Sequence, residues 1–234
     1  MNVFIAMPYY NREQFIPLIK HNINKQSYSK DLMTLIMDDD TDIKLSIDSI
    51  QNLKDSISPC KLIYLSSQRK TIGKKRNDIC KYIFKNYGKH AIVVNMDTDD
   101  LYNKDYIKYG VELITNNKYN LIGASDMLFT FPKHDYSMSY MRTGNKLCIH
   151  EASMIYTIKL WKHSNKYNEG TLGEGKQFIQ GIPNSFIYDC PIQKCLVCIA
   201  HGNNTINKDI FYNDNLKIGF KMDNYDREII SKCI

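Results

Sequence analysis

The sequence predicts an α/β fold with a mostly parallel central sheet flanked by helices. Two observations predict it. Short apolar runs without polar alternation recur through residues 2–95, as in strands that are buried on both faces. Segments with apolar residues at helical spacing separate these runs, and strands that alternate with helices favour a parallel sheet.

In the first half of the chain, four apolar runs predict strands: VFIAM at 3–7, LMTLIM at 32–37, KLIYL at 61–65 and AIVVNM at 91–96. Helical periodicity follows Asn11, Thr41 and Gly73. The first hundred residues therefore predict a β-α-β-α-β-α-β unit.

The second half is less regular. We expect strands at 121–124, 127–131, 139–142 and 195–200 and a helix at 152–161. Because we find neither an internal repeat nor a Pro/Gly-rich linker, we expect a single domain over 1–234.

The composition is that of an ordinary globular protein, with 43% hydrophobic residues in 234. Seven cysteines, an odd number, predict reduced thiols. The chain shows neither a transmembrane segment nor a secretory signal, so we expect a cytoplasmic protein. The net charge of +6 permits attraction to phosphate groups without establishing it.

Each predicted strand of the first half is followed by a polar cluster, in order PYYNR, DDDTD, SSQRK and DTDDLY. The carboxyl ends of parallel strands lie at one edge of a sheet, where ligands bind. The four clusters therefore predict a binding site at that edge.

The fourth cluster contains Asp97, Asp99 and Asp100. Carboxylates held close together raise one another's pKa unless a cation lies between them. Mg²⁺ and Mn²⁺ prefer such oxygen ligands together with those of a diphosphate, so this cluster predicts a metal and nucleotide site. Alternatively, Asp99 or Asp100 caps a helix that starts near Asn103.

The second and third clusters also allow two interpretations. MDDDTD at 37–42 is either a turn or a set of acceptors for a base N–H or ribose hydroxyls. The basic stretch QRKTIGKKRND at 68–78 is either a solvent-exposed helix start or a segment whose charge attracts phosphate-bearing molecules.

Taken together, four segments resemble the successive motifs of family 2 glycosyltransferases of the GT-A fold: MPYYNREQFIPLIKHNINKQSY at 7–28, IMDDDTD at 36–42, IGKKRND with its G-x-x-R-N at 72–78, and NMDTDDLY at 95–102. The resemblance implies a Rossmann-like GT-A fold, with a nucleotide-binding half at 1–102 and an acceptor-side half at 103–234. The amino-acid composition, of the kind that AT-rich coding DNA produces, also resembles that of proteins from large DNA viruses.

The resemblance implies metal-dependent, inverting transfer of a sugar from a nucleotide donor, a UDP-sugar, to a glycan or protein acceptor. By the same resemblance, Pro8 and Tyr10 line the base pocket. Asp39 or Asp38 reads the uracil, and Arg76 approaches the donor.

The resemblance also places the metal, Mn²⁺ or Mg²⁺. Asp99 would ligate it, and Asp97 would contact the ribose or the metal-bound donor. His201, in AHGNNT after the last apolar run, would complete the metal shell or contact the diphosphate. A purely structural histidine is the alternative.

An inverting transfer needs a general base on the acceptor side. In the family this base is a downstream carboxylate, often in an E-D pair near a helix start. The matching segment is NEGTLGEGKQFIQG at 168–181, which has Glu174-Gly175 in place of that pair. We expect Glu174 to be the base, with Glu169 as the second choice, and a role at a helix N-terminus as the alternative for Glu174.

Three rival hypotheses remain. Cys190, Cys195, Cys198 and His201 are loosely spaced like a zinc site, although CLVCIA is apolar enough for a core strand. A sugar-phosphate nucleotidyltransferase would carry a glycine-rich loop where this chain has PYYNR. A binding module without turnover is the third, but we expect no nucleic-acid partner because acidic strand ends repel a phosphate backbone. The sequence leaves the oligomeric state open.

Overall fold

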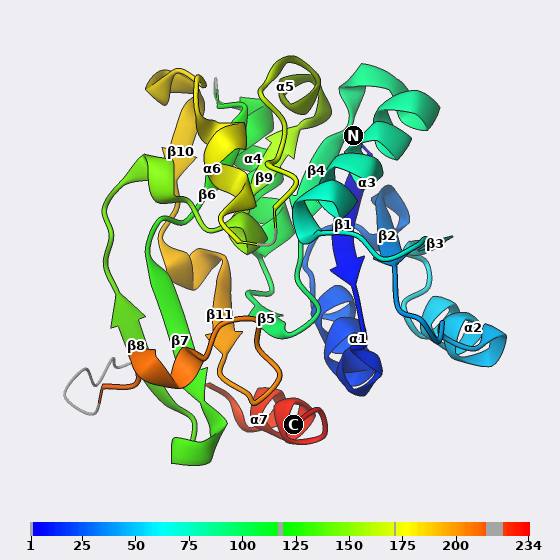
Figure 1. Cartoon of the computed structure of the whole chain (residues 1–234), viewed down its shortest axis with the longest axis vertical. Coiled ribbons are helices and arrows are strands. Elements are labelled where there is room, and N and C mark those ends of the chain that lie inside the picture. The colour runs from blue at the N-terminus through cyan, green and yellow to red at the C-terminus, as the bar shows by residue number, and fades with distance from the viewer. Residues whose placement is uncertain (1, 117–118, 171, 214–221) are drawn as a thin grey trace.

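The computed structural model describes residues 2–116, 119–170, 172–213 and 222–234 (Figure 1). The first half contains, in order, β1 (Val3–Tyr9), α1 (Ile16–Asn24), β2 (Met33–Asp39), α2 (Ile47–Ser56), β3 (Lys61–Ser66), α3 (Ile72–Tyr87) and β4 (Ile92–Asn95). All of its strands are parallel: β1 pairs with β2 and β4, and β2 pairs with β3. The predicted β-α-β-α-β-α-β unit is therefore confirmed.

The second half contains β5 (Asp100–Tyr102), α4 (Tyr106–Asn116), β6 (Leu121–Gly123), β7 (Met127–Phe131), β8 (Ser137–Met141), β9 (Ile155–Thr157), α5 (Ile158–His163), α6 (Glu174–Ile179), β10 (Ile187–Asp189), β11 (Leu196–Ile199) and α7 (Asn224–Ser231). A seven-stranded sheet has the order β10-β6-β9-β4-β1-β2-β3, and a four-stranded sheet has the order β5-β11-β7-β8. The large sheet is the mostly parallel one that the sequence predicts.

The helix expected at 152–161 is wrong in its first half. Residues 155–157 form β9, which lies antiparallel between β4 and β6, and α5 begins only at Ile158. The side chain of Thr157 caps α5 by accepting a hydrogen bond from the N–H of Leu160. A short apolar run is compatible with either a buried strand or a helix. Here residues 155–157 form a strand because β4 and β6 lie on either side and pair with them.

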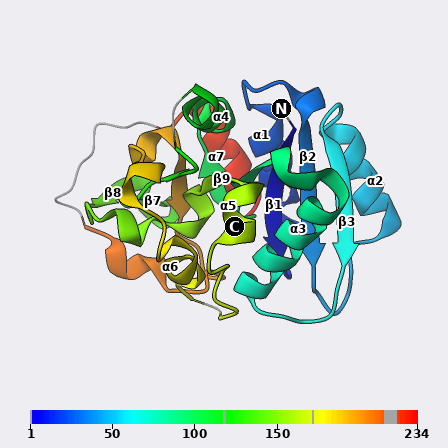
Figure 2. The same ribbon diagram turned by 90° about the horizontal axis from the view of Figure 1, so that it is seen from above.

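The large sheet is covered on both faces. Alternate residues of β1 enter two separate hydrophobic clusters: Ile5 packs in one with residues of α1 and α4, and Phe4 packs in the other with residues of α3 and α5. Figure 2 shows these helix pairs on opposite sides of the sheet. This arrangement explains why the strand sequences are continuously apolar.

The small sheet brings the end of β11 to the segment between β4 and β5. Asn22 of α1 holds β5 in place, because its Nδ2 donates to the carbonyl of Asp100 at 2.8 Å and its Oδ1 accepts from the N–H of Tyr102 at 3.0 Å. The alternative in which Asp99 or Asp100 caps a helix is wrong: Asp100 lies in β5, and α4 starts at Tyr106.

In the part of the chain that the structure describes, no helix combines the length and the apolar character needed to cross a membrane.

Candidate active site

A cavity of about 220 Å³ lies at the carboxyl ends of the parallel strands. Pro8 and Tyr10 line it together with residues of the basic stretch after β3 and with Asp97 and Asp99. The guanidinium of Arg69 lies over the Tyr10 ring, 3.3 Å from the ring centre. The structure thus brings together the first, third and fourth polar clusters, and a base-binding role for Pro8 and Tyr10 stays a prediction.

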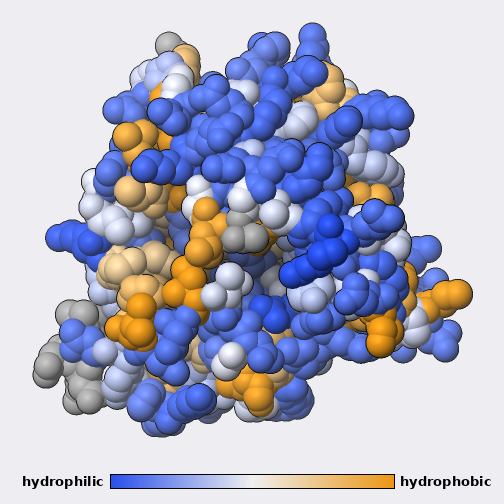
Figure 3. Space-filling model, in the orientation of Figure 1, coloured by the Kyte–Doolittle hydropathy of each residue, from blue (hydrophilic) through white to orange (hydrophobic). Residues whose placement is uncertain are grey.

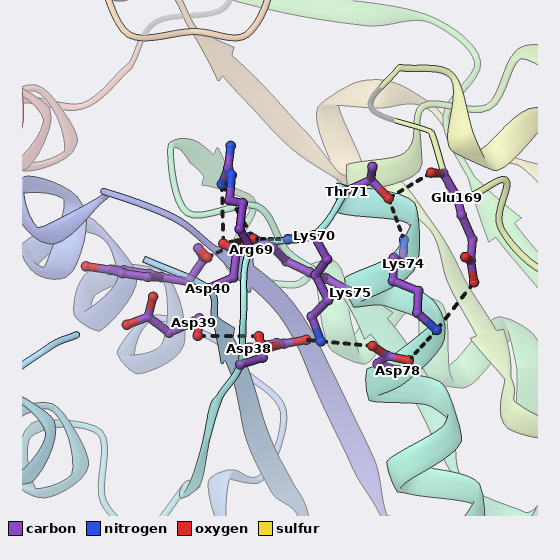
Figure 4. A network of polar contacts seen from close by, with 12 residues as sticks. Asp38, Asp39, Asp40, Arg69, Lys70, Thr71, Lys74, Lys75, Asp78 and Glu169 are labelled. Atoms are coloured by element: carbon purple, nitrogen blue, oxygen red, sulfur yellow. Dashed lines mark hydrogen bonds and ion pairs between the residues drawn. The ribbon is translucent and has the colours of Figure 1, made fainter. Parts of the chain in front are cut away.

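Asp38 and Asp39, expected to read a uracil, are both buried and bound to the protein itself (Figure 4). Asp39 accepts hydrogen bonds from the Tyr64 hydroxyl and from the backbone N–H two residues further on. Asp38 accepts from Ser67 Oγ at 2.6 Å and forms an ion pair with Lys70 at 2.8 Å. In this state these carboxylates tie the end of β2 to β3 and its following loop, and their role in base recognition stays a prediction.

Sequence reasoning did not single out Asp40, which is the centre of the basic network. Its buried carboxylate forms an ion pair with Lys75, accepts from the N–H of Lys70 at 2.9 Å and lies 3.5 Å from Arg69. Lys75 also donates to the carbonyl of Tyr9 at 2.8 Å. Burial lowers the pKa of Lys75, although the charge of Asp40 opposes that shift. The sequence does hold a signal for Asp40: DDDTD has a third aspartate at the end of one predicted strand, and a stretch rich in lysine and arginine follows the next predicted strand.

Arg76 joins two of the predicted site carboxylates. Its side chain is only 1% exposed, and it donates from Nη2 to Asp97 Oδ1 at 2.8 Å and from Nε to Glu174 Oε1 at 3.0 Å. Burial raises the pKa of Glu174 even though the charge of Arg76 opposes the rise. Arg76 Nη1 is buried without a hydrogen-bond partner among the described residues.

Asp99 and His201, 102 residues apart in sequence, meet at 3.0 Å between Oδ2 and Nε2. Arg12 lies 3.7 Å from the same oxygen. Burial would raise the pKa of Asp99, but the hydrogen bond from His201 and the charges of Lys208 and Arg12 hold it below its usual value. Asp100 faces Lys208 at 3.2 Å instead.

These residues supply only part of a metal site. Among the residues that the structure describes, no group of three His, Cys, Asp or Glu side chains is arranged to hold a metal ion. Asp99 and His201 offer one oxygen and one nitrogen of the right kind, while Asp97 binds Arg76. His201 Nδ1 accepts from the N–H of Asn203 at 3.2 Å, and its Nε2 lies 3.0 Å from Asp99 Oδ2 and 2.7 Å from Asn204 Nδ2, so both ring nitrogens already have protein partners.

The four residues that the sequence offers as zinc ligands do not form a metal site in the described structure. Cys190, Cys195 and Cys198 are buried free thiols. A hydrogen bond with Cys190 and burial both raise the pKa of Cys195, which disfavours the thiolate that zinc requires. His201 turns to Asp99, and the described residues hold no four-ligand cluster.

A second cavity, of about 310 Å³, adjoins the first and shares Ile72, Asp97, Asp99 and Thr205 with it. Its lining combines charged residues with large apolar ones, which include Met127, Phe129, Leu172, Ile206 and Phe211. Figure 3 shows a hollow in the middle of this face between hydrophobic residues on the left and hydrophilic residues on the right. The site is therefore a continuous two-part depression.

The model of the family described as glycosyl transferase family 2 matches residues 4–172. The chain belongs to this family. The match extends well past the four motifs that carry the sequence resemblance, into the segment that precedes Gly173.

Solved structures share the fold of this family 2 chain. The mannosyltransferase PcManGT from Pyrobaculum calidifontis, in complex with GDP-Man and Mn²⁺, is 14% identical with a TM-score of 0.65, over 86% of this chain and 58% of that one. TarS 1-349 from S. aureus in complex with UDP-GlcNAc is 17% identical with a TM-score of 0.64, over 87% of this chain and 60% of that one. The family 2 chain thus has the GT-A fold and spans about 60% of these proteins. No curated protein matches it.

The two glutamates predicted as general base lie in different surroundings. Glu174 lines the second cavity beside Arg76. Glu169 does not line it; its side chain is 58% exposed and lies 3.5 Å from Lys74. The cavity has a further glutamate, Glu151, which is not among the candidate bases predicted from the sequence. No local pattern marks Glu151, because the fold alone brings it to α6.

Proposed function

We propose that this family 2 chain transfers a sugar from a nucleotide donor, a UDP-sugar, to a glycan or protein acceptor with inversion at the anomeric carbon. The observation that carries the proposal is the pair of adjoining cavities joined at Asp97 and Asp99. The first cavity, with its aromatic and basic lining, suits a nucleoside diphosphate. The second suits the sugar and the acceptor, since sugars present both hydroxyls and apolar faces.

Asp99 and His201 would hold Mn²⁺ or Mg²⁺ together with the donor, and the metal would neutralise charge on the departing diphosphate. Asp97 lies beside them and is held in place by Arg76, which fits a contact with the ribose or the donor. Lys70, Lys75 and Arg69 surround the strand ends and supply positive charge for the diphosphate.

Inversion requires a base on the side of the sugar opposite to the diphosphate. Glu174 and Glu151 are the glutamates that line the second cavity, and either would take the proton of the acceptor hydroxyl. We also propose a cytoplasmic location, where the seven free cysteines stay reduced.

Thermal unfolding with a panel of nucleotide sugars tests the donor site, because a ligand that binds only the folded state raises the melting temperature. At a ligand concentration of 100 times Kd the stabilisation is about 2.7 kcal/mol. UDP-GlcNAc, GDP-mannose and free UDP, each with and without Mn²⁺, form the panel. We expect a Mn²⁺-dependent rise with a UDP-sugar.

Two variants give the test its control. Asp99→Asn should remove the Mn²⁺-dependent part of the shift. Asp135→Asn should keep it, because Asp135 is 97% exposed at a turn and lines neither cavity. If no nucleotide sugar stabilises the folded protein, the donor site is refuted. Binding without release of nucleoside diphosphate would favour a binding module.

A further inference from the structure

Gly175 lacks a side chain where another residue needs the space. A Cβ at this position would lie 2.6 Å from Glu151 Cγ, 3.0 Å from its Oε1 and 2.8 Å from Met154 Cε. The backbone N–H of Gly175 donates to the same Oε1 at 2.9 Å. The side chain of Glu151 therefore fills the volume that a side chain at 175 would take, and its carboxylate is fixed against the first turn of α6.

Glu151 is held from its own side as well. It opens a short 3₁₀ turn, Glu151–Ser153, just before β9. Its carbonyl accepts from Asn95 Nδ2 at 2.7 Å and from the N–H of Met154 at 3.2 Å. Asn95 ends β4, two residues before Asp97. The position of Glu151 relative to the donor side is thus set by the central sheet.

The two cavity glutamates differ in what they already bind. Glu174 Oε1 accepts from the buried guanidinium of Arg76. Glu151 Oε1 accepts only the Gly175 N–H, and no hydrogen bond or ion pair to Oε2 is found in the described parts of the chain. A general base needs a free lone pair that faces the reacting hydroxyl. Among the described residues, Glu151 Oε2 is such a free oxygen, and no cation lies within ion-pair distance of it.

We propose that Glu151, rather than Glu174, is the general base of the transfer, which rests on the glycosyltransferase function proposed above. As the acceptor oxygen bonds to the anomeric carbon, Glu151 Oε2 takes its proton. The bond from that carbon to the diphosphate oxygen breaks, and its electron pair leaves with the nucleoside diphosphate. Glu174 is then a positioning residue that holds Arg76 beside Asp97.

Matched amide variants separate the two roles. The readout is nucleoside diphosphate release from the nucleotide sugar that gives the largest thermal shift, with water or methyl glycosides as acceptors. Glu151→Gln should lower kcat by at least about 100-fold, in the range for loss of a general base. Its thermal shift with the donor and its KM for the donor should stay unchanged. Glu174→Gln keeps an acceptor for Arg76 and should lose less than about 10-fold.

A second test moves the carboxylate from position 151 to position 175. Activity should return only if the role of Glu151 is catalytic and not purely structural. Glu151→Ala removes two of the three atoms nearest to a Cβ at position 175, and the third is the end of the flexible side chain of Met154. Gly175→Asp is therefore introduced in that background. We expect the double variant E151A/G175D to regain part of the activity that Glu151→Ala loses. Gly175→Asp alone should clash with Glu151 and lower the melting temperature.

The inference is overturned if Glu151→Gln releases nucleoside diphosphate at nearly the wild-type rate, or if Glu174→Gln alone abolishes release while it keeps donor binding. Both results would leave the proposed function intact. Wild-type protein that binds no nucleotide sugar, or binds one without releasing nucleoside diphosphate, would instead refute the proposed function and the inference with it.

Discussion

Replacing Arg76 by methionine should destabilise the folded protein by about 3–5 kcal/mol, the usual cost of removing one partner of a buried ion pair. Methionine fills most of the space of the arginine stem but supplies no hydrogen bond. The change removes the donors to Glu174 at 3.0 Å and to Asp97 at 2.8 Å. Both carboxylates are then left without their cation.

The two carboxylates do not contribute equally. The side chain of Glu174 is 6% exposed, so its charge has little access to water once Arg76 is gone. That of Asp97 is 24% exposed and can turn toward solvent. Most of the cost should therefore come from Glu174, and the double variant R76M/E174M should recover about 2 kcal/mol of the loss, since the orphaned charge is gone.

The pH dependence has a definite sign. The pKa of Glu174 is already raised by burial, against the opposing charge of Arg76, and loss of Arg76 raises it further. A carboxyl with a raised folded pKa favours the folded state below its unfolded pKa and loses that contribution as pH rises through the folded pKa. The destabilisation of Arg76→Met should thus be larger at pH 8 than at pH 5.

Urea unfolding at both pH values measures these differences, with a constant m-value as the check of two-state behaviour. Lys81→Met is the matched control, because Lys81 is exposed on the same helix and its loss should change stability by less than about 0.5 kcal/mol. The reasoning is refuted if Arg76→Met costs no more than the control, or if E174M does not rescue it.

Three further experiments test the fold. Asn22→Ala leaves two backbone groups of β5 buried and unpaired, so it should lower the free energy of unfolding in urea by about 2–4 kcal/mol. Asn24→Ala is the control: the hydrogen bonds of Asn24 are exposed, so its loss should cost less than about 1 kcal/mol. Gly73→Ala would put a Cβ 1.8 Å from the carbonyl oxygen of Asn168 and should lower the melting temperature, since backbone must move. Cys148 is the exposed cysteine of the seven, so Ellman's reagent should label one thiol rapidly in native protein and seven in denaturant.

Each of these outcomes has a clear opposite. Equal losses for Asn22→Ala and Asn24→Ala would mean that the α1 amide does not hold β5. An unchanged melting temperature for Gly73→Ala would mean that the loop at 168 is free to move away. Rapid labelling of several thiols would contradict the burial that raises the pKa of Cys60 to about 11 and that of Cys80 to about 12.

Local patterns in the sequence were enough to predict the β-α-β-α-β-α-β half and the sheet edge at which its strands end. Periodicity and composition act over a few residues, and in a parallel sheet they also determine which polar clusters share an edge. The same reasoning failed at 152–161, where a short apolar run did not reveal that β9 enters the sheet between β4 and β6.

The contacts inside the site were decided by tertiary structure. His201 reaches Asp99 across 102 positions because β11 pairs with β5, and Arg76 binds Glu174 across 98. Glu151 reaches Gly175 only because the turn before β9 packs against the first turn of α6. Such contacts depend on strand order and on the packing of distant segments, which no local spacing encodes. The sequence by itself thus determined which residue types stand at the strand ends, and the fold decided which of them are free to act.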